Sequence, residues 1–225
     1  RKVLPESFPI DYLVFSSGAG ILDWKRREVV YARSLTAEQV TELRILARRT
    51  WRFFEQFVGP DGHWLPPDNV QVAPGFQVAQ RTSPTNIGLA LLATLSAHDF
   101  GYVTSGELVT RLEGMLHTVG QLPTYRGHLY NWYETRNLRP LEPRYVSSVD
   151  SGNLAAHLLT LANACDEIRV GTADAAQILA GIGDGLVAVP EAEQAAETDP
   201  CDGDAGLEEG RDLAVVPAVA IVRLA

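Results

Sequence analysis

The sequence has few cysteines and few lysines, and each shortage argues against a class of protein. Its two cysteines, Cys165 and Cys201, lie far apart, so the sequence predicts neither a disulfide framework nor a cysteine-bound metal. The five histidines include no HExxH pair, and we expect no metal ion and no cofactor. Lys2 and Lys25 are the only lysines, and no cluster of basic residues marks a nucleic-acid-binding face.

Long apolar runs are also missing. No stretch reaches the roughly 18 consecutive apolar residues that a membrane-spanning helix needs. Residues 1–15 contain charge and proline where a signal peptide would have its apolar core, so we expect a soluble chain without one. The formal net charge is -9, but residues 191–212 hold nine acidic residues against one arginine. The rest of the chain is therefore close to neutral.

Strand signals are scarce, whereas helix signals are frequent. Residues 28–32, EVVYA, are the only short strand candidate, and we expect them to form the edge of a hairpin at most. Thr36 and Gln39 form a capping box ahead of an apolar pattern with helical spacing, which Gly59 and Pro60 end. The sequence therefore predicts a long amphipathic first helix.

Four more helices are predicted in residues 83–101, 105–122, 151–168 and 172–186. The second and fourth helices are apolar around most of their circumference and should be buried on nearly all sides, whereas the first and third have one apolar stripe. This alternation is typical of helical hairpins wound into a toroid. We predict an all-α fold of (α/α)6-toroid-like hairpins, with ~30 to 40 residues in each hairpin. The five helices make about two and a half hairpins, whereas a closed ring needs about six, so we expect the toroid to be incomplete.

Three segments follow from these patterns. Residues 1–35 form a lead-in to the helices, and residues 36–184 form the helical domain. Residues 185–225 are rich in Ala, Glu, Asp and Gly, and we interpret them as an acidic tail that resembles a linker.

The loops that lead into the two buried helices are rich in aromatic and polar side chains. Residues 126–153 cannot form one helix or strand, because Pro140 and Pro143 interrupt them. A sugar presents apolar C–H faces and a belt of hydroxyl groups, which aromatic rings and planar polar groups bind. We therefore predict a sugar site. Its candidate residues are Trp64, Asp68, Asn69, Arg81, Thr82, Thr85, Asn86, Tyr130, Asn131, Trp132, Tyr133, Arg136, Arg144, Tyr145 and Asn153.

Two carboxyl groups are the candidates for catalysis, because cleavage of a glycosidic bond usually takes an acid and a base or nucleophile. Asp150 is expected at or just before the start of the fourth helix, where the helix dipole favours a charged carboxylate and hence a base. A helix N-cap explains Asp150 equally well. Glu134 is the candidate acid, and the alternative for it is an ion pair with Arg136 or Arg144. Trp64 could instead act as a plug that closes its own loop.

Three long phrases resemble the glycoamylase-like domain of the cyclic β-1,2-glucan synthases. They are ARRTWRFFEQFVGPDGHWLPPDNVQ, RTSPTNIGLALLATLSAHDFGY and YRGHLYNWYETRNLRPLEPRYVSSVDSGNLAAHLLTL, and the likeness runs from about residue 46 to about residue 164. The resemblance implies an (α/α)6 toroid that binds linear β-1,2-glucan and closes it into a ring by transglycosylation or, as in related enzymes, hydrolyses it. It also implies that Ser151 belongs to the pocket. Relatives commonly have Asp at the position of Glu134.

The same resemblance implies a much larger parent protein in the inner membrane of Gram-negative bacteria, on the cytoplasmic side. That parent would also carry a glycosyltransferase domain and a phosphorylase-like domain. Family domains continue with further acidic residues, for which residues 185–225 offer no counterpart. Two alternatives therefore stay open: a non-catalytic glucan-binding fragment, and a helical protein-interaction scaffold, which would expose an apolar groove instead of polar aromatic loops.

Overall fold

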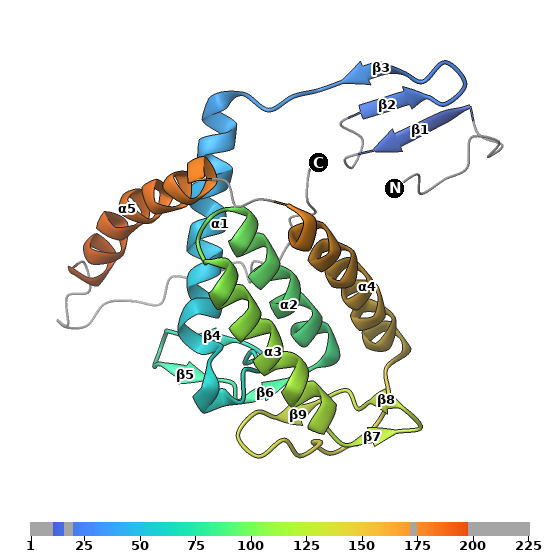
Figure 1. The fold of residues 1–225 in the computed structure, drawn as a ribbon. Coiled ribbons are helices and arrows are strands. Elements are labelled where there is room, and N and C mark those ends of the chain that lie inside the picture. The colour runs from blue at the N-terminus through green and yellow to red at the C-terminus, as the bar shows by residue number, and fades with distance from the viewer. Residues whose placement is uncertain (1–10, 16–19, 172–174, 198–225) are drawn as a thin grey trace, which may run out of the picture. The chain divides into compact units, whose positions relative to one another are not determined.

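The computed structural model describes residues 11–15, 20–171 and 175–197, and it describes the side chains of residues 11–13, 20–171 and 175–188 (Figure 1). The chain divides into two compact units, and the boundary between them lies between Leu43 and Arg44. Each unit is built differently, the first from strands and the second mainly from helices.

The N-terminal unit contains a three-stranded antiparallel sheet in the order β1-β2-β3. Its strands are β1 (Tyr12–Phe15), β2 (Gly20–Asp23) and β3 (Glu28–Ala32). The prediction that residues 28–32 form an edge strand is confirmed, but the expectation that they are the only strand candidate is wrong. β1 and β2 are four residues long, which is too short for an alternating pattern to distinguish them from other apolar runs.

All five predicted helices are present, and their caps explain where they begin. The helices are α1 (Ala37–Phe57), α2 (Pro84–Asp99), α3 (Ser105–Gln121), α4 (Ser148–Val170) and α5 (Ala175–Glu197). The backbone N–H of Thr36 donates to Gln39 Oε1 (3.0 Å), and the N–H of Gln39 donates to Thr36 Oγ1 (3.2 Å). Ser83 caps α2 by accepting from the N–H of Asn86 at 3.2 Å. Helices dominate the described residues, which confirms the predicted fold class, and the toroid itself stays a prediction.

The helix α2 is the centre of the second unit. Figure 1 shows it between α3 and α4, and it packs against both. Ile87, Ala90 and Leu91 are 0% exposed, which confirms that α2 is buried on nearly all sides. The core residues around it include Trp51, Phe54, Val58, Leu65, Leu108, Leu112, Met115, Tyr133, Leu154 and Leu161.

The expectation that α4 is buried all round is wrong for this chain. Leu154, Leu161 and Ala164 are buried, but Val149 is 71% exposed and Leu159 is 69% exposed. A helix that is apolar on every side needs neighbours on several sides. Among the described elements, α2 is the main neighbour of α4, so its outer side faces solvent.

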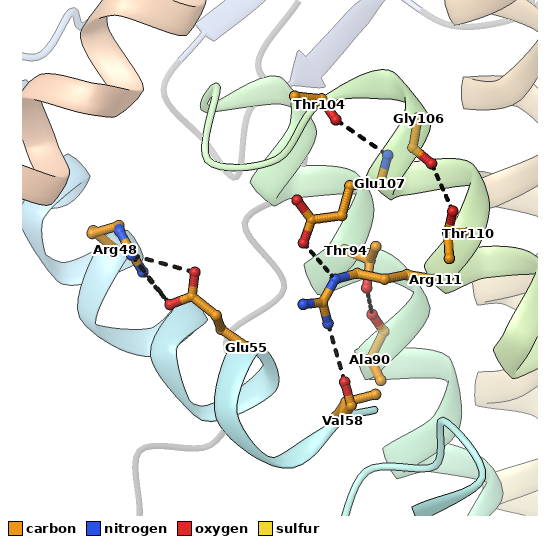
Figure 2. Close-up of polar contacts among 10 residues, drawn as sticks. All are labelled: Arg48, Glu55, Val58, Ala90, Thr94, Thr104, Gly106, Glu107, Thr110 and Arg111. Atoms are coloured by element: carbon orange, nitrogen blue, oxygen red, sulfur yellow. Dashed lines mark hydrogen bonds and ion pairs between the residues drawn. The ribbon is translucent and has the colours of Figure 1, made fainter. Parts of the chain in front are cut away.

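The helices α1 and α3 are joined by Arg111, as Figure 2 shows. Its Nε donates to Glu107 Oε1 at 3.0 Å, and its Nη1 donates to the carbonyl of Val58, just beyond α1, at 3.1 Å. The guanidinium also lies 5.1 Å from the centroid of the Trp51 ring. A cation that binds the last carbonyls of a helix is favoured by the helix dipole. Arg111 therefore fixes the end of α1, from which the loop to the site begins.

The helix α5 is attached to the unit by Asp184. The Oδ2 atom of Asp184 lies 2.7 Å from Arg44 Nη2, and it accepts a hydrogen bond from the Tyr102 hydroxyl at 3.1 Å. Burial, together with the nearby Asp184 carboxylate, raises the pKa of Tyr102. The helix continues to Glu197, so residues 185–197 of the predicted acidic tail are helical, and residues 198–225 lie outside the described residues.

The helices α2 and α4 approach each other closely at Gly88. A Cβ at this position would lie 2.2 Å from Nδ1 of His157 on α4. That nitrogen is buried and has no hydrogen-bond partner. The burial lowers the pKa of His157, because the charged imidazolium would lose its hydration without gaining a partner. Hence α2 and α4 approach each other closely beside a neutral histidine.

We expect the protein to lose stability in mild acid, with His157 as one cause. In the unfolded chain its pKa is about 6.5, and in the folded chain it is lower. Below pH ~6.5 the unfolded state therefore binds more protons, so the free energy of unfolding falls as the pH drops towards the folded-state pKa. Denaturant unfolding between about pH 8 and about pH 5 should show a weaker pH dependence for His157→Gln than for the native chain. Equal pH dependence in the two proteins would contradict this assignment.

Candidate functional site

The loops before α2 and α4 meet through a short antiparallel ladder at one end of the helices (Figure 1). Strand β6 (Arg81–Thr82) pairs with β9 (Tyr133–Glu134), so that Arg81 lies opposite Glu134 and Thr82 opposite Tyr133. Thr82 and Tyr133 are both 0% exposed and face the core. Because side chains alternate along a strand, Arg81 and Glu134 share the other face. The ladder therefore places the exposed Arg81 and the half-buried Glu134 side by side on one face.

Two more short ladders flank this one. They are β4 (Val70–Gln71) with β5 (Gln77–Val78), and β7 (Thr124–Tyr125) with β8 (His128–Leu129). A single turn of 3-10 helix, Pro60–Gly62, follows α1. These short elements hold the loops in defined conformations.

A first group of predicted site residues forms around Asp68. Its Oδ2 accepts from Arg81 Nε (3.1 Å), Arg81 Nη2 (2.9 Å) and Asn69 Nδ2 (3.1 Å), and its Oδ1 accepts from Asn86 Nδ2 (3.3 Å). The Arg81 guanidinium also lies 4.8 Å from the centroid of the Trp132 ring. Asp68 therefore orients Arg81 and Asn86. Because Arg81 lies over one face of Trp132, a stacked sugar would use the opposite face of that ring.

A second group forms around Asp150, which is the third residue of α4. The N-cap of this helix is Ser147, whose Oγ accepts from the N–H of Asp150 at 3.1 Å. The alternative that Asp150 caps the helix is therefore wrong. Its Oδ1 accepts from the Thr85 hydroxyl at 2.6 Å, and its Oδ2 is 2.9 Å from the side-chain nitrogen of Asn131. Both carboxylate oxygens thus accept a hydrogen bond from an uncharged donor.

The amide of Asn131 connects this carboxylate to two aromatic residues. Asn131 is 7% exposed, and its amide orientation follows from its neighbours. The nitrogen donates to Asp150, while the oxygen accepts from the Tyr145 hydroxyl (2.6 Å) and from Trp132 Nε1 (2.5 Å). Its backbone N–H donates to the carbonyl of Tyr145 at 2.8 Å. Asn131 is therefore an organising residue, with its side-chain atoms committed to the protein.

Two of the aromatic residues predicted to bind sugar, Tyr133 and Trp64, lie in or against the hydrophobic core instead. Tyr133 is 0% exposed, and its hydroxyl donates to the carbonyl of Pro123 at 2.6 Å and accepts from the N–H of Tyr130 at 2.7 Å. Burial raises the pKa of Tyr133. The ring of Trp64 packs against the hydrophobic core, and a Cβ at Gly114 would lie 2.5 Å from it. Tyr133 is therefore a core residue, and the position of Trp64 agrees with the plug that closes its loop.

The carboxyl group of Glu134 has no ion pair with either of its predicted partners. Arg144 instead lies 2.7 Å from a carboxylate oxygen of Glu142, and Arg136 is exposed. Glu134 Oε1 is buried and has no hydrogen-bond partner. Burying a carboxyl oxygen costs free energy unless a hydrogen-bond donor, from the protein or from a ligand, reaches it. Glu134 therefore stays a candidate, beside Arg81 on the outer face of the ladder.

The remaining candidates lie around these groups. Asn153 Nδ2 donates to Thr85 Oγ1 at 3.3 Å, and Ser151 is half-buried next to Asp150. The ring of Tyr130 is partly buried against that of Tyr133. In the sequence, Thr85 is only one of several polar candidates. Its position in the first turn of α2, directly before Asn86, is the one signal that could have identified it as a partner of Asp150.

Neither a metal site nor a membrane span is found among residues 11–15, 20–171 and 175–197. In those ranges no three His, Cys, Asp or Glu side chains are grouped as metal ligands. None of the helices there combines the length and the apolar character that crossing a bilayer requires. Cys165 is exposed with a free thiol, and Cys201 lies outside the described residues.

Comparison with known proteins places this helical chain in a family. Residues 45–175 match the family described as "Protein of unknown function (DUF3131)", and because they make up more than half of the chain, the chain belongs to that family. The chain is also 50% identical, over 159 residues, to the "Cyclic beta-(1,2)-glucan synthase NdvB" of Rhizobium meliloti (strain 1021). This confirms the resemblance that the sequence indicates. The alignment covers 70% of this chain but only 6% of that relative, so the chain corresponds to a small part of it.

A solved structure of a glucoamylase-like protein from Bacteroides fragilis NCTC 9343 is also similar. It shares 19% sequence identity, with a TM-score of 0.45, over 60% of this chain and 36% of that chain.

Proposed function

We propose that this chain is part of a carbohydrate-active domain that processes β-1,2-glucan. The observation that carries the proposal is the set of linked side chains at the end of α2 and α4. It offers the rings of Trp132 and Tyr145 beside carboxylate, amide and guanidinium groups, which is the combination that binds sugars. The 50% identity to a protein named a cyclic β-(1,2)-glucan synthase supports the linkage type. The linked set is Asp68, Asn69, Arg81, Thr85, Asn86, Asn131, Trp132, Tyr145, Asp150 and Asn153.

In the proposed reaction an acid protonates the glycosidic oxygen and the anomeric carbon bonds to a new oxygen. The bond from the anomeric carbon to the protonated oxygen breaks, and the glucan segment that carries this oxygen leaves. Attack by a hydroxyl of the same glucan then closes a ring, whereas attack by water hydrolyses the chain. We propose Glu134 as the candidate acid and Asp150 as the group that accepts the proton of the attacking hydroxyl or holds substrate hydroxyls. No cofactor is needed for either outcome.

A non-catalytic glucan-binding role is the second candidate. It is favoured by the occupation of both Asp150 oxygens, since Thr85 and Asn131 already donate to them. In that case the chemistry would need carboxyl groups from the longer protein. We further propose that the longer protein is associated with the bacterial inner membrane, with this part on the cytoplasmic side, and that it carries glycosyltransferase and phosphorylase-like domains.

Replacing Trp132 by Ala should weaken glucan binding, because a sugar would lose its stacking surface. One aromatic contact is worth about 0.5–1.5 kcal/mol, so the expected loss is roughly threefold to tenfold in affinity. Calorimetric titration with linear β-1,2-glucan measures it, and β-1,3-glucan of matched length is the control ligand. Tyr31→Ala is the control variant, because Tyr31 is an exposed aromatic residue of the N-terminal unit.

Mass spectrometry of the same samples identifies the reaction. Products lighter by one water than a linear glucan with the same number of glucose units indicate ring closure. Shorter linear chains without such products indicate hydrolysis, and unchanged glucan with measurable binding indicates the non-catalytic role. The proposed function fails if the native chain binds β-1,2-glucan no better than β-1,3-glucan.

A further inference from the structure

We propose that Thr85 is a positioning residue that holds the Asp150 carboxylate in one orientation. The assignment rests on the proposed function of the site. Thr85 Oγ1 lies 2.6 Å from Asp150 Oδ1 and 3.3 Å from Asn153 Nδ2. The amide nitrogen of Asn153 can only donate, and a hydroxyl group has a single proton. The Thr85 proton is therefore directed at Asp150, and the oxygen lone pair at Asn153.

The first turn of α2 is a rigid platform for this hydroxyl. Thr85 and Asn86 are the second and third residues of the helix, and Ile87 directly after them is 0% exposed. Threonine is branched at Cβ, so few side-chain rotamers are open to it. The neighbouring Asn86 donates to Asp68 at 3.3 Å. Two consecutive side chains of one buried helix thus reach the two carboxylates around which the site is built.

The contact lies on the same interface as the contact between Gly88 and His157. Thr85 and Gly88 are three residues apart on α2, and Asn153 and His157 are four residues apart on α4, so each pair shares one face of its helix. Gly88 meets His157, and Thr85 meets Asn153 and Asp150. The spacing that Gly88 permits between the helices therefore also sets the distance from Thr85 to the carboxylate.

Asn131 completes the arrangement from the opposite side by donating to Asp150 Oδ2. With one donor on each oxygen, a change in the χ1 rotamer of Asp150 would break two hydrogen bonds. A group that must meet a sugar hydroxyl or an attacking oxygen acts best when it is held in a single orientation before substrate binds. Thr85 supplies half of that restraint without needing to touch the sugar.

A purely structural role for Thr85, joining α2 to α4, makes different predictions for two variants. Thr85→Val keeps the branched shape and removes the hydroxyl, whereas Thr85→Ser keeps the hydroxyl and removes a methyl group. If Thr85 acts by positioning, only Thr85→Val should impair glucan binding or turnover. A structural role would lower the melting temperature without separating the two variants in function.

The test uses the full chain and three measurements on each variant. Calorimetry gives the affinity for linear β-1,2-glucan, together with kcat and KM where turnover is seen. Scanning calorimetry gives Tm. Three-bond NMR couplings give the χ1 rotamer of Asp150 in the absence of glucan. Thr110→Val on α3 is the matched control, because Thr110 is exposed and its hydroxyl donates to the carbonyl of Gly106 (Figure 2).

We expect Thr85→Val to lose roughly tenfold or more in affinity or kcat and to populate more than one Asp150 rotamer. Thr85→Ser should stay within about threefold of the native chain. The inference is overturned if Asp150 keeps one rotamer in Thr85→Val, or if Thr85→Ser is as impaired as Thr85→Val. Thr85→Ala serves as the second hydroxyl-free variant if Thr85→Val does not fold. If the native chain binds no glucan, the proposed function fails, while the rotamer measurement still decides the role of Thr85.

Discussion

Asp150→Asn is expected to abolish glucan turnover and to weaken binding of β-1,2-glucan by about tenfold or more. The amide has the same size, but it replaces one acceptor oxygen by a donor, which would face the hydroxyl of Thr85 or the amide nitrogen of Asn131. Asn131 can turn its amide to accept from this group only by giving up its bond from Trp132 Nε1, whereas its nitrogen could then donate to the Tyr145 hydroxyl. The substitution also removes the charge that strengthens hydrogen bonds to sugar hydroxyls.

The same variant should fold almost as well as the native chain. Ser147 caps α4, so Asp150→Asn leaves the cap intact, and we expect the free energy of unfolding to change by no more than about 1 kcal/mol. Ser147→Ala is the matched control: it should lose about 1 kcal/mol of stability and keep its glucan affinity. Titration and denaturant unfolding on the same preparations measure both quantities. Native binding combined with a large loss of stability in Asp150→Asn would contradict a role in the site.

The helices could be predicted from the sequence because their signals are local. The capping box of Thr36 and Gln39 and the cap of Ser83 involve residues three positions apart, and the structure has both sets of hydrogen bonds. Gly101, the last residue of the predicted helical range 83–101, has φ of 78°, in the left-handed region that glycine enters without strain. No knowledge of distant contacts was needed for these assignments.

The geometry of the site depends on contacts between distant segments. Thr85 and Asp150 are 65 positions apart, and no spacing rule within a helix or strand relates them. The loops that lead into α2 and α4 could be recognised by composition, but composition does not say which side chains face outward. The register of β6 against β9 settles this by burying Thr82 and Tyr133 together. Tyr133 thus has the chemistry of a sugar-binding ring and the location of a core residue.

Gly88→Ala is expected to lower the free energy of unfolding by about 1–3 kcal/mol or more. The added Cβ would lie 2.2 Å from Nδ1, 3.0 Å from Cγ and 3.2 Å from Cβ of His157, so the helices must separate or the imidazole must move. Alanine is the better helix former by about 1 kcal/mol, which offsets only part of this loss. Denaturant unfolding of the variant and the native chain measures the difference.

Two further variants separate the contact with His157 from the general effect of replacing a helical glycine. Gly120→Ala on α3 has no heavy atom within 4 Å of the new Cβ, so it should gain up to about 1 kcal/mol. Adding His157→Ala to Gly88→Ala should recover part of the lost stability, and the double-mutant cycle gives the coupling between the two positions. If Gly88→Ala stabilises the chain as Gly120→Ala does, α2 and α4 do not pack as closely as described. Because Thr85 and Asp150 face each other across the same interface, Gly88→Ala should also weaken glucan binding, which would connect the packing of the helices to the geometry of the carboxylate.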